Sequence, residues 1–246
     1  MKTKQAFGSL SRSFYSSDVL TVLRIKLVLG EIKAGDKLVE LKIADEMNTS
    51  RGPVRNALFM LEKEGLVSFL PNGRTEAAGF SLDDLDHLYE TRLSLEQLAL
   101  ESAFRKPAMD LTQIRMLNRG MRQEMTRASQ FTQHDIDYHH ELVALSGNKY
   151  LQQAWQSFRP VMETVLLITN SQIRSNADVS ANKGYVLEHH QQITDALTRG
   201  DREQTLELLR EHLQTGKAIM KEKMTAVIDG SDALTAAAVL SRNGLA

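Results

Sequence analysis

The sequence predicts a mainly α protein in two parts, an N-terminal winged helix-turn-helix followed by an all-α antiparallel helical bundle. Two observations carry this prediction. Residues 35–74 combine short helical segments with a tight turn and a hairpin signal, and from Ser81 onward the apolar residues follow helical spacing alone. A chain of 246 residues, 42% hydrophobic and 25% charged, can bury a sizeable core.

Composition excludes several classes of protein. The chain has no cysteine, so disulfides and thiolate ligands are excluded, and any transition-metal site must use histidine and carboxylate. No apolar run approaches the ~18–20 residues of a membrane span, and residues 1–12 lack the apolar stretch of a signal peptide. We therefore expect a cytoplasmic protein without a membrane partner. Residues 1–80 carry a net charge of +3 and the remainder −4, which permits a basic DNA-binding face on the first part.

The first part is predicted to span residues 17–79, after a polar, Ser-rich flexible arm over residues 1–16. Gly30 ends its first helix, and Ser50 is placed to cap the second of two short helices. Asn72-Gly73 between two β-compatible runs is a strong hairpin signal. The expected helices lie at 17–29, at 40–47 and from the Ser50 cap to Gly65, and the expected strands at 66–70 and 74–77.

The second part, residues 80–224, is predicted to be wholly helical. Breaks are expected at Ser146-Gly147-Asn148 and at Gly200-Asp201. The Ala-rich residues 225–246 fit either a docked helix or a frayed tail. The expected helices lie at 81–105, 110–128, 131–145, 148–174, 179–199 and 202–223.

Candidate DNA-binding residues lie at the start of the second short helix. In a helix-turn-helix this helix inserts its first turn into the major groove, where Arg51 and Arg55, four residues apart on one face, can each bind guanine bidentately. Ser50, with the helix N-terminal amides, suits a phosphate. The alternative is that both arginines merely solvate an exposed helix. The wing tip adds three residues short or basic enough to reach the backbone or minor groove, Asn72, Gly73 and Arg74.

These segments resemble the winged-helix domain of GntR-type bacterial transcription regulators. The matching runs are 29–38, 43–46, 50–58 and 61–67. Where many members carry a basic residue on the preceding helix, this chain has Leu41, with Lys42 beside it as the candidate there. The resemblance implies DNA contacts at Ser50, Arg51, Gly52, Arg55 and the wing glycine Gly73.

The second part holds all seven histidines, and some of them have the spacing of metal ligands. Asp135 and His139, four residues apart, share one helix face. His190 and His212 lie ten residues before and twelve residues after Gly200, or roughly 15 and 18 Å at ~1.5 Å per helical residue, so antiparallel helices place them at similar height. Such a set suits Zn²⁺ or Ni²⁺, with an open position for a small anion.

Spacing alone leaves open the choice between His139 and its neighbour His140, and between His190 and its neighbour His189. It also leaves open that these histidines are ordinary surface or hydrogen-bonded core residues. The seven histidines are at positions 87, 134, 139, 140, 189, 190 and 212.

Residues 135–142 resemble the Asp-x-x-x-His segment of the all-helical FCD ligand domain of the FadR-type subfamily, and two later segments match its other histidine positions. The resemblance implies that Arg92 pairs with an effector carboxylate, although a salt bridge to Glu96 on the same helix face is an equal alternative. Arg159 is a further candidate for lining the effector cavity. The implied metal ligands are Asp135, His139, His190 and His212.

The resemblance implies a homodimeric transcription regulator, acting as a repressor on a palindromic operator in double-stranded DNA. A divalent metal and a small organic acid effector would bind the second part. One alternative is a metal-dependent hydrolase using the Asp/His₃ site, with Glu96 as the one obvious general base. Another alternative is a regulator in which the histidines, or a metal that they hold, are purely structural.

Overall fold

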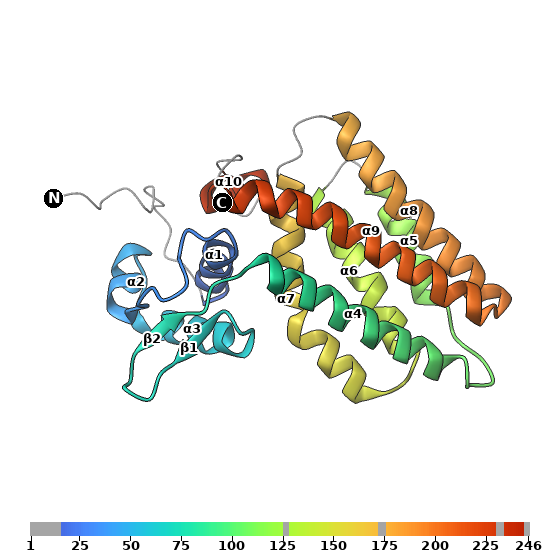
Figure 1. Cartoon of the computed structure of the whole chain (residues 1–246), viewed down its shortest axis with the longest axis horizontal. Coiled ribbons are helices and arrows are strands. Elements are labelled where there is room, and N and C mark those ends of the chain that lie inside the picture. Colours follow the sequence, from blue (N-terminus) through green and yellow to red (C-terminus); the bar gives the residue numbers. More distant parts are fainter. Residues whose placement is uncertain (1–15, 125–127, 172–175, 230–233, 244–246) are drawn as a thin grey trace. The chain divides into compact units, whose positions relative to one another are not determined.

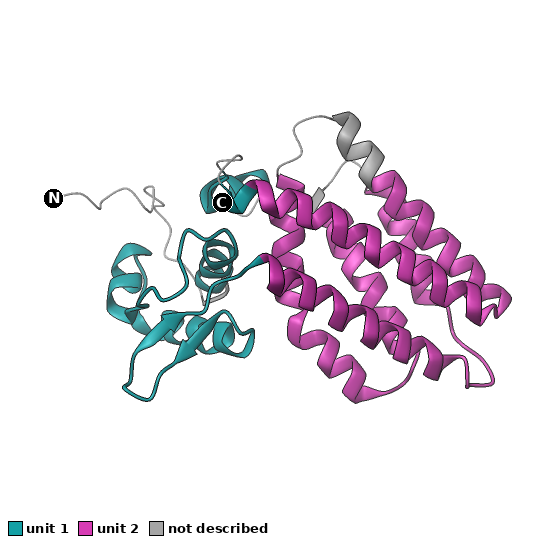
Figure 2. Ribbon diagram, viewed as in Figure 1, with its two compact units in different colours: residues 1–81, 227–246 teal, residues 82–226 magenta. Residues whose placement is uncertain are grey.

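The fold was obtained as a computed structural model, and it confirms the mainly α class. The chain divides into two compact units, residues 1–81 with 227–246, and residues 82–226 (Figure 2). Among the helices of the described part, none is long and apolar enough to cross a membrane. The expected arm over residues 1–16 lies almost wholly outside the described residues, which are 16–124, 128–171, 176–229 and 234–243.

The first unit contains a winged helix (Figure 1). Helix α3 buries Val54, Ala57, Leu58 and Leu61, the i, i+3, i+4, i+7 positions of one face, and packs against α1 and α2. At its end, Glu64 accepts two hydrogen bonds from the buried Arg24 of α1, at 2.6 and 2.7 Å. The elements are α1 (Ser16–Val28), α2 (Glu40–Glu46), α3 (Arg51–Lys63), β1 (Val67–Phe69) and β2 (Thr75–Ala77).

Turn chemistry shapes both the helix-turn-helix and the wing. Asn48, with a φ of +47°, lies in the turn between α2 and α3, a conformation that asparagine tolerates better than most residues. Strands β1 and β2 pair antiparallel, and Gly73 at the wing tip has a φ of +77°, which favours glycine. One expectation is wrong: Ser50 occupies the N-cap position of α3 with extended backbone, but its side chain makes no capping hydrogen bond.

A short C-terminal helix, α10 (Ala236–Arg242), completes the first unit and packs against α1. The hydroxyl of Thr235 accepts a hydrogen bond from the Ala238 amide, which caps the helix. The Ala236 amide donates to the Glu31 carboxylate at 2.6 Å. Within residues 225–246, the docked-helix alternative therefore holds for this segment.

The second unit is a bundle of six described helices whose order in the chain matches the predicted one. Helices α4, α5, α6, α8 and α9 contribute to a shared apolar core, with Ile114, Tyr138 and Leu209 fully buried in it. Gly200, with a φ of +71°, makes the turn between the two antiparallel helices that end and begin there. The helices are α4 (Leu82–Ala103), α5 (Thr112–Gln123), α6 (Ala128–Ala144), α7 (Lys149–Ser171), α8 (Asn176–Arg199) and α9 (Arg202–Ile228).

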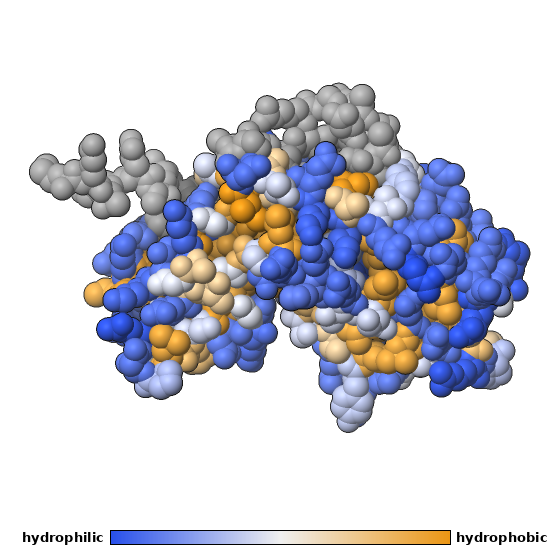
Figure 3. All heavy atoms as spheres, in the orientation of Figure 1, coloured by the Kyte–Doolittle hydropathy of each residue, from blue (hydrophilic) through white to orange (hydrophobic). Residues whose placement is uncertain are grey.

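Hydrophilic residues cover most of the face shown in Figure 3, with smaller hydrophobic areas between them. The candidate functional polar groups form two sets, which differ in their exposure to solvent. One set lies exposed on the winged helix, and the other is buried inside the helical bundle.

Candidate functional site

Both predicted recognition arginines project into solvent from the first turn of α3, with side chains 62% and 54% exposed for Arg51 and Arg55. Both also reach one carboxylate, that of Glu40 at the start of α2. Arg55 donates from Nε and Nη2 to the two Glu40 oxygens, each at 2.9 Å, while Arg51 Nη2 lies 3.3 Å from Oε2. The pairing with Arg55 is bidentate, which fixes the plane of its guanidinium.

The charge state of this arrangement follows from its hydrogen bonds. The Arg55 guanidinium, the larger influence, lowers the pKa of Glu40, and Glu40 in turn raises the pKa of Arg55. The pair is therefore fully ionised at neutral pH. Because water surrounds it, the ion pair is weak and a DNA phosphate or base can displace it.

The remaining predicted DNA contacts also lie at the surface of the first unit. The side chain of Lys42 is 74% exposed, with Glu46 at 3.9 Å. At the wing tip, the Asn72 side chain accepts a hydrogen bond from the Arg74 amide at 3.0 Å, which holds the turn. All six of the following residues are exposed: Lys42, Ser50, Gly52, Asn72, Gly73 and Arg74.

In the second unit, the four predicted metal ligands come together. Asp135 and His139 extend from α6, His190 from α8 and His212 from α9, and their ligand atoms all lie within 4.8 Å of one another. The three Nε2 atoms form a triangle with sides of 3.1, 3.2 and 3.2 Å. Asp135 Oδ1 lies 3.4 Å from His190 Nε2 and 3.9 Å from His139 Nε2.

These spacings fit a metal ion better than a hydrogen-bond network. Metal–nitrogen bonds of about 2.05 Å separate neighbouring ligand nitrogens by about 2.9 Å in an octahedral site and about 3.3 Å in a tetrahedral one. Three neutral imidazole nitrogens facing one another cannot all be satisfied by sharing protons. The Oδ1 atom of Asp135 is buried and has no hydrogen-bond partner, as expected for a carboxylate oxygen whose role is to coordinate a cation.

Burial sets the protonation of the cluster. Desolvation lowers the pKa values of His190 and His212 well below the usual range of histidine, and the neighbouring histidines of the cluster lower them further. Both are therefore neutral imidazoles at pH 7, which is the form that binds metal. Desolvation also raises the pKa of Asp135, and a bound cation would offset that penalty.

One buried carboxylate, that of Glu96 on α4, organises the surroundings of the cluster. Its Oε2 lies 2.7 Å from His139 Nδ1, and its Oε1 accepts from Arg92 Nε at 2.7 Å and from Trp155 Nε1 at 3.3 Å. The first contact places the proton of His139 on Nδ1 and leaves Nε2 free to coordinate. Although burial would raise the pKa of Glu96, His139 and Arg92 outweigh it and lower the value.

Glu96 is thus fully engaged by three buried partners, so it is not the poised general base that a hydrolase would need. Sequence reasoning named Glu96 as a helix-face partner of Arg92, and this salt bridge is present. The contact with His139, 43 residues away, had no local signal in the sequence.

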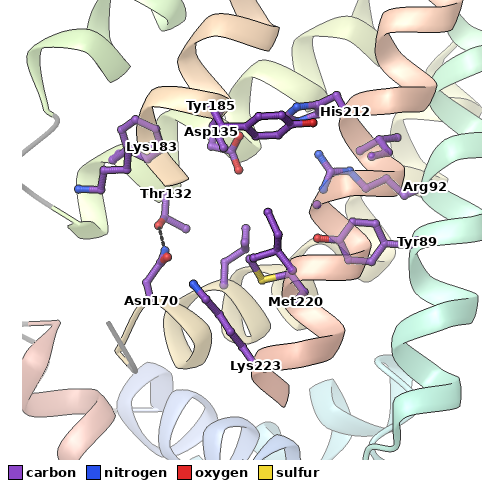
Figure 4. A pocket seen from close by; sticks show the side chains of 16 residues that line it. Tyr89, Arg92, Thr132, Asp135, Asn170, Lys183, Tyr185, His212, Met220 and Lys223 are labelled. Atoms are coloured by element: carbon purple, nitrogen blue, oxygen red, sulfur yellow. Dashed lines mark hydrogen bonds between the residues drawn. The ribbon is translucent and has the colours of Figure 1, made fainter. Parts of the chain in front are cut away.

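A cavity of about 80 Å³ adjoins the cluster. Figure 4 shows Asp135 and His212 on its wall, with Arg92 and Tyr89 beside them. Arg92 is 3% exposed, and although its Nε is paired with Glu96, its Nη2 has no hydrogen-bond partner. The alternative of a salt bridge between Arg92 and Glu96 is therefore present at Nε, and the predicted contact with an effector carboxylate would use Nη2.

Three other predictions for this unit can be checked. Arg159, predicted to line the effector cavity, does not line this one; it pairs with Asp137 at 2.6 Å and with Glu163 at 2.7 Å. His140 contacts the ring of Trp155 outside the cluster, and the ring of His189 packs at a tilt against that of Tyr185. Of the two pairs of adjacent histidines, packing therefore places His139 and His190 in the cluster and His140 and His189 outside it.

Comparison with known proteins agrees with this architecture. Residues 16–76 match the model for bacterial regulatory proteins of the gntR family, and residues 87–215 match the FCD domain. The gluconate operon transcriptional repressor of Bacillus subtilis is 30% identical over 165 residues, 65% of this chain and 67% of the relative. Its counterpart in Bacillus licheniformis is 25% identical over 207 residues, covering 82% and 84% of the two chains.

Among solved structures, the chain resembles that of Lar, which controls the expression of the Listeria monocytogenes agr system. The TM-score is 0.68, with 19% identity, over 88% of this chain and 99% of that one. At this identity the likeness shows the fold. With both family models matched in order, and with regulators as its relatives, the chain belongs to the GntR family of bacterial transcriptional regulators, carries the FCD domain typical of the FadR-type subfamily, and is a DNA-binding regulator rather than an enzyme.

Proposed function

We propose that this regulator is a repressor whose affinity for its operator is set by a small carboxylate bound at a divalent-metal site. Residues 80–224 would bind the metal and the effector, and residues 17–79 would bind the DNA. The observation that carries the proposal is the convergence of three buried imidazoles and one carboxylate beside a cavity. Zn²⁺ and Ni²⁺ suit this donor set best.

The effector chemistry follows from Arg92. A buried guanidinium with an unpartnered Nη2 beside a metal site favours a carboxylate, which can coordinate the metal through one oxygen and accept from Arg92 through the other. When bound, the metal would supply positive charge for anchoring this anion. Glu96 would orient the two residues that hold the ligand, His139 and Arg92.

On the DNA side, we propose a cytoplasmic homodimer that places two copies of α3 in successive major grooves of a palindromic operator. Arg51 and Arg55 would read base edges, while Ser50, Gly52, Lys42 and the wing tip would contact the backbone or minor groove. Two connections join the units, since α4 directly follows the wing and α9, which carries His212, leads back to the first unit. A ligand that favours one bundle geometry would therefore shift the population of DNA-binding conformations.

The metal site is tested by elemental analysis of the purified full-length protein and two matched variants. We expect about one divalent ion per chain in the wild type and in His189→Ala, and its loss in His190→Ala, since only His190 belongs to the cluster. Equal metal content in the two variants would contradict the site.

The regulatory role is tested by fluorescence anisotropy on the DNA upstream of the protein's own gene. Metal-loaded protein should bind this DNA with an affinity that changes at least about fivefold when the effector acid is present, the usual lower bound of allosteric coupling. If no organic acid alters the affinity although the metal is bound, the metal is structural and the effector proposal fails.

A further inference from the structure

On the basis of the proposed metal site, we infer that Tyr138 is a positioning residue for the metal ligand His190. The ring of Tyr138 sets the plane of the His190 imidazole, so that Nε2 of His190 points at the ion. Tyr138 is not itself a ligand. It acts through ring contact, and it thereby determines how tightly and in what geometry the cluster holds its metal.

The histidine ligands differ in what holds their rings. Nδ1 of His139 lies 2.7 Å from the Glu96 carboxylate, the usual way in which a ligand histidine is oriented. Nδ1 of His190 is buried and has no hydrogen-bond partner within the described ranges, and the same is true of His212, which lies on the cavity wall. The torsion that turns an imidazole about Cβ–Cγ has broad minima. The His190 ring therefore needs another contact to fix its plane.

The ring of Tyr138 supplies this contact. The Tyr138 and His190 rings are stacked, with their centroids 4.0 Å apart and 12° between their planes. Both residues are fully buried in a close-packed interior, so the imidazole cannot turn about Cβ–Cγ without striking the tyrosine ring. The Tyr138 ring also stands nearly perpendicular to that of His139, with centroids 5.5 Å apart. One tyrosine thus contacts two of the three histidine ligands.

Hydrogen bonds hold Tyr138 against the backbone of His190. The Tyr138 hydroxyl donates to the His190 carbonyl oxygen at 3.0 Å. The same oxygen accepts from Asn118 Nδ2 at 3.2 Å and from the Thr194 hydroxyl at 2.8 Å. These donors come from α5, α6 and α8, and they anchor the turn of α8 that carries His190. The stacked ring is therefore fixed relative to the residue that it orients.

The alternative is that Tyr138 only fills the apolar core, to which it also belongs. The two roles differ in what they change. A residue that only fills the core affects the free energy of unfolding and leaves the metal site of the folded protein as it was. A positioning residue also changes the affinity for metal and the coordination geometry of the folded protein.

The first test is a competition titration of the full-length protein against a zinc-binding dye. Tyr138→Leu removes the aromatic face, and its zinc affinity should fall about ten- to hundredfold. Tyr138→Phe keeps the ring and should stay within about threefold of the wild type, because Asn118 and Thr194 still bind the carbonyl. The control Leu197→Ala destabilises the same core about two turns from His190 on α8, and its zinc affinity should be unchanged.

Cobalt provides the second test, because the visible absorption of Co²⁺ depends on its coordination geometry. With the site saturated, Tyr138→Leu should give a spectrum different from that of the wild type, whereas Tyr138→Phe and Leu197→Ala should reproduce the wild-type bands. Circular dichroism checks that each variant is folded. If Tyr138→Leu does not fold, Tyr138→Met takes its place, since its longer and more flexible side chain also lacks a flat ring.

Several outcomes overturn the inference and leave the proposed metal site intact. One is a folded Tyr138→Leu with wild-type zinc affinity and cobalt spectrum, and another is an equal loss in Leu197→Ala. An equal loss in Tyr138→Phe would assign the effect to the hydroxyl and not to the ring. Failure of both Tyr138→Leu and Tyr138→Met to fold would make Tyr138 a structural residue. Absence of zinc binding by the wild type would defeat this inference together with the proposed function.

Discussion

Two arginine–glutamate pairs, one in each unit, have similar pairing distances but opposite surroundings. In the winged helix, Arg55 and Glu40 pair at 2.9 Å with side chains 54% and 25% exposed. In the bundle, Arg92 and Glu96 pair at 2.7 Å with side chains 4% and 0% exposed. Water competes for the first pair and is excluded from the second.

This difference decides what each pair can do. An exposed ion pair contributes little to stability and exchanges partners readily, so Arg55 remains available to DNA. A buried pair is costly to break, because removal of one partner leaves an uncompensated charge in the interior. Glu96 can therefore hold Arg92 and His139 in fixed positions, as a preorganised ligand site requires.

The largest expected effect is that of Glu96→Ala. The variant leaves the Arg92 guanidinium buried without its counter-ion and removes the hydrogen-bond acceptor for His139. The free energy of unfolding of the bundle should therefore fall by about 3–5 kcal/mol. Urea denaturation followed by circular dichroism measures this. A loss no larger than that of Glu40→Ala would mean that burial does not distinguish the two pairs.

Glu96→Gln sharpens the comparison by keeping the shape and removing the charge. The amide can still accept a hydrogen bond from His139, but the imidazole becomes a weaker ligand, and zinc affinity should fall about ten- to hundredfold. A competition titration against a zinc-binding dye gives the affinity, with His140→Ala as the control outside the cluster. Wild-type affinity in Glu96→Gln would show that the carboxylate charge does not tune the metal site.

The double variant Arg51→Ala/Arg55→Ala removes both arginines that pair with Glu40 and tests whether they bind DNA. We expect the affinity for operator DNA to fall by about tenfold or more, because a bidentate arginine–guanine contact discriminates by that much or better. Anisotropy titrations at fixed salt measure the loss, and thermal unfolding should be nearly unchanged. Unaltered operator affinity would remove these arginines from the recognition surface.

The smallest expected effect is that of Glu40→Ala. Releasing both arginines should raise the affinity for scrambled DNA a few-fold, because a competing carboxylate is removed, and it should narrow the ratio of specific to non-specific binding. Titrations with operator and scrambled duplexes at the same salt concentration give this ratio. If Glu40→Ala instead weakens binding to both duplexes equally, Glu40 supports the fold of α2 and does not compete with DNA.

Local patterns in the sequence predicted much of this protein. Apolar spacing predicted the helices of both units, and Asn72-Gly73 predicted the hairpin in which Gly73 has a φ of +77°. Helical spacing also paired Asp135 with His139, and Arg92 with Glu96, since residues four apart share a face. These features depend on neighbours within one turn of helix or one hairpin, which the order of residues encodes directly.

The tertiary structure alone decided which distant groups meet. Spacing could not choose between adjacent histidines, but packing turned His139 and His190 inward. It brought Glu96 onto His139 across 43 residues, set Glu40 against Arg55 across 15, and directed Arg159 away from the cavity. Contacts of this kind depend on how whole helices pack against one another, which no short window of sequence contains.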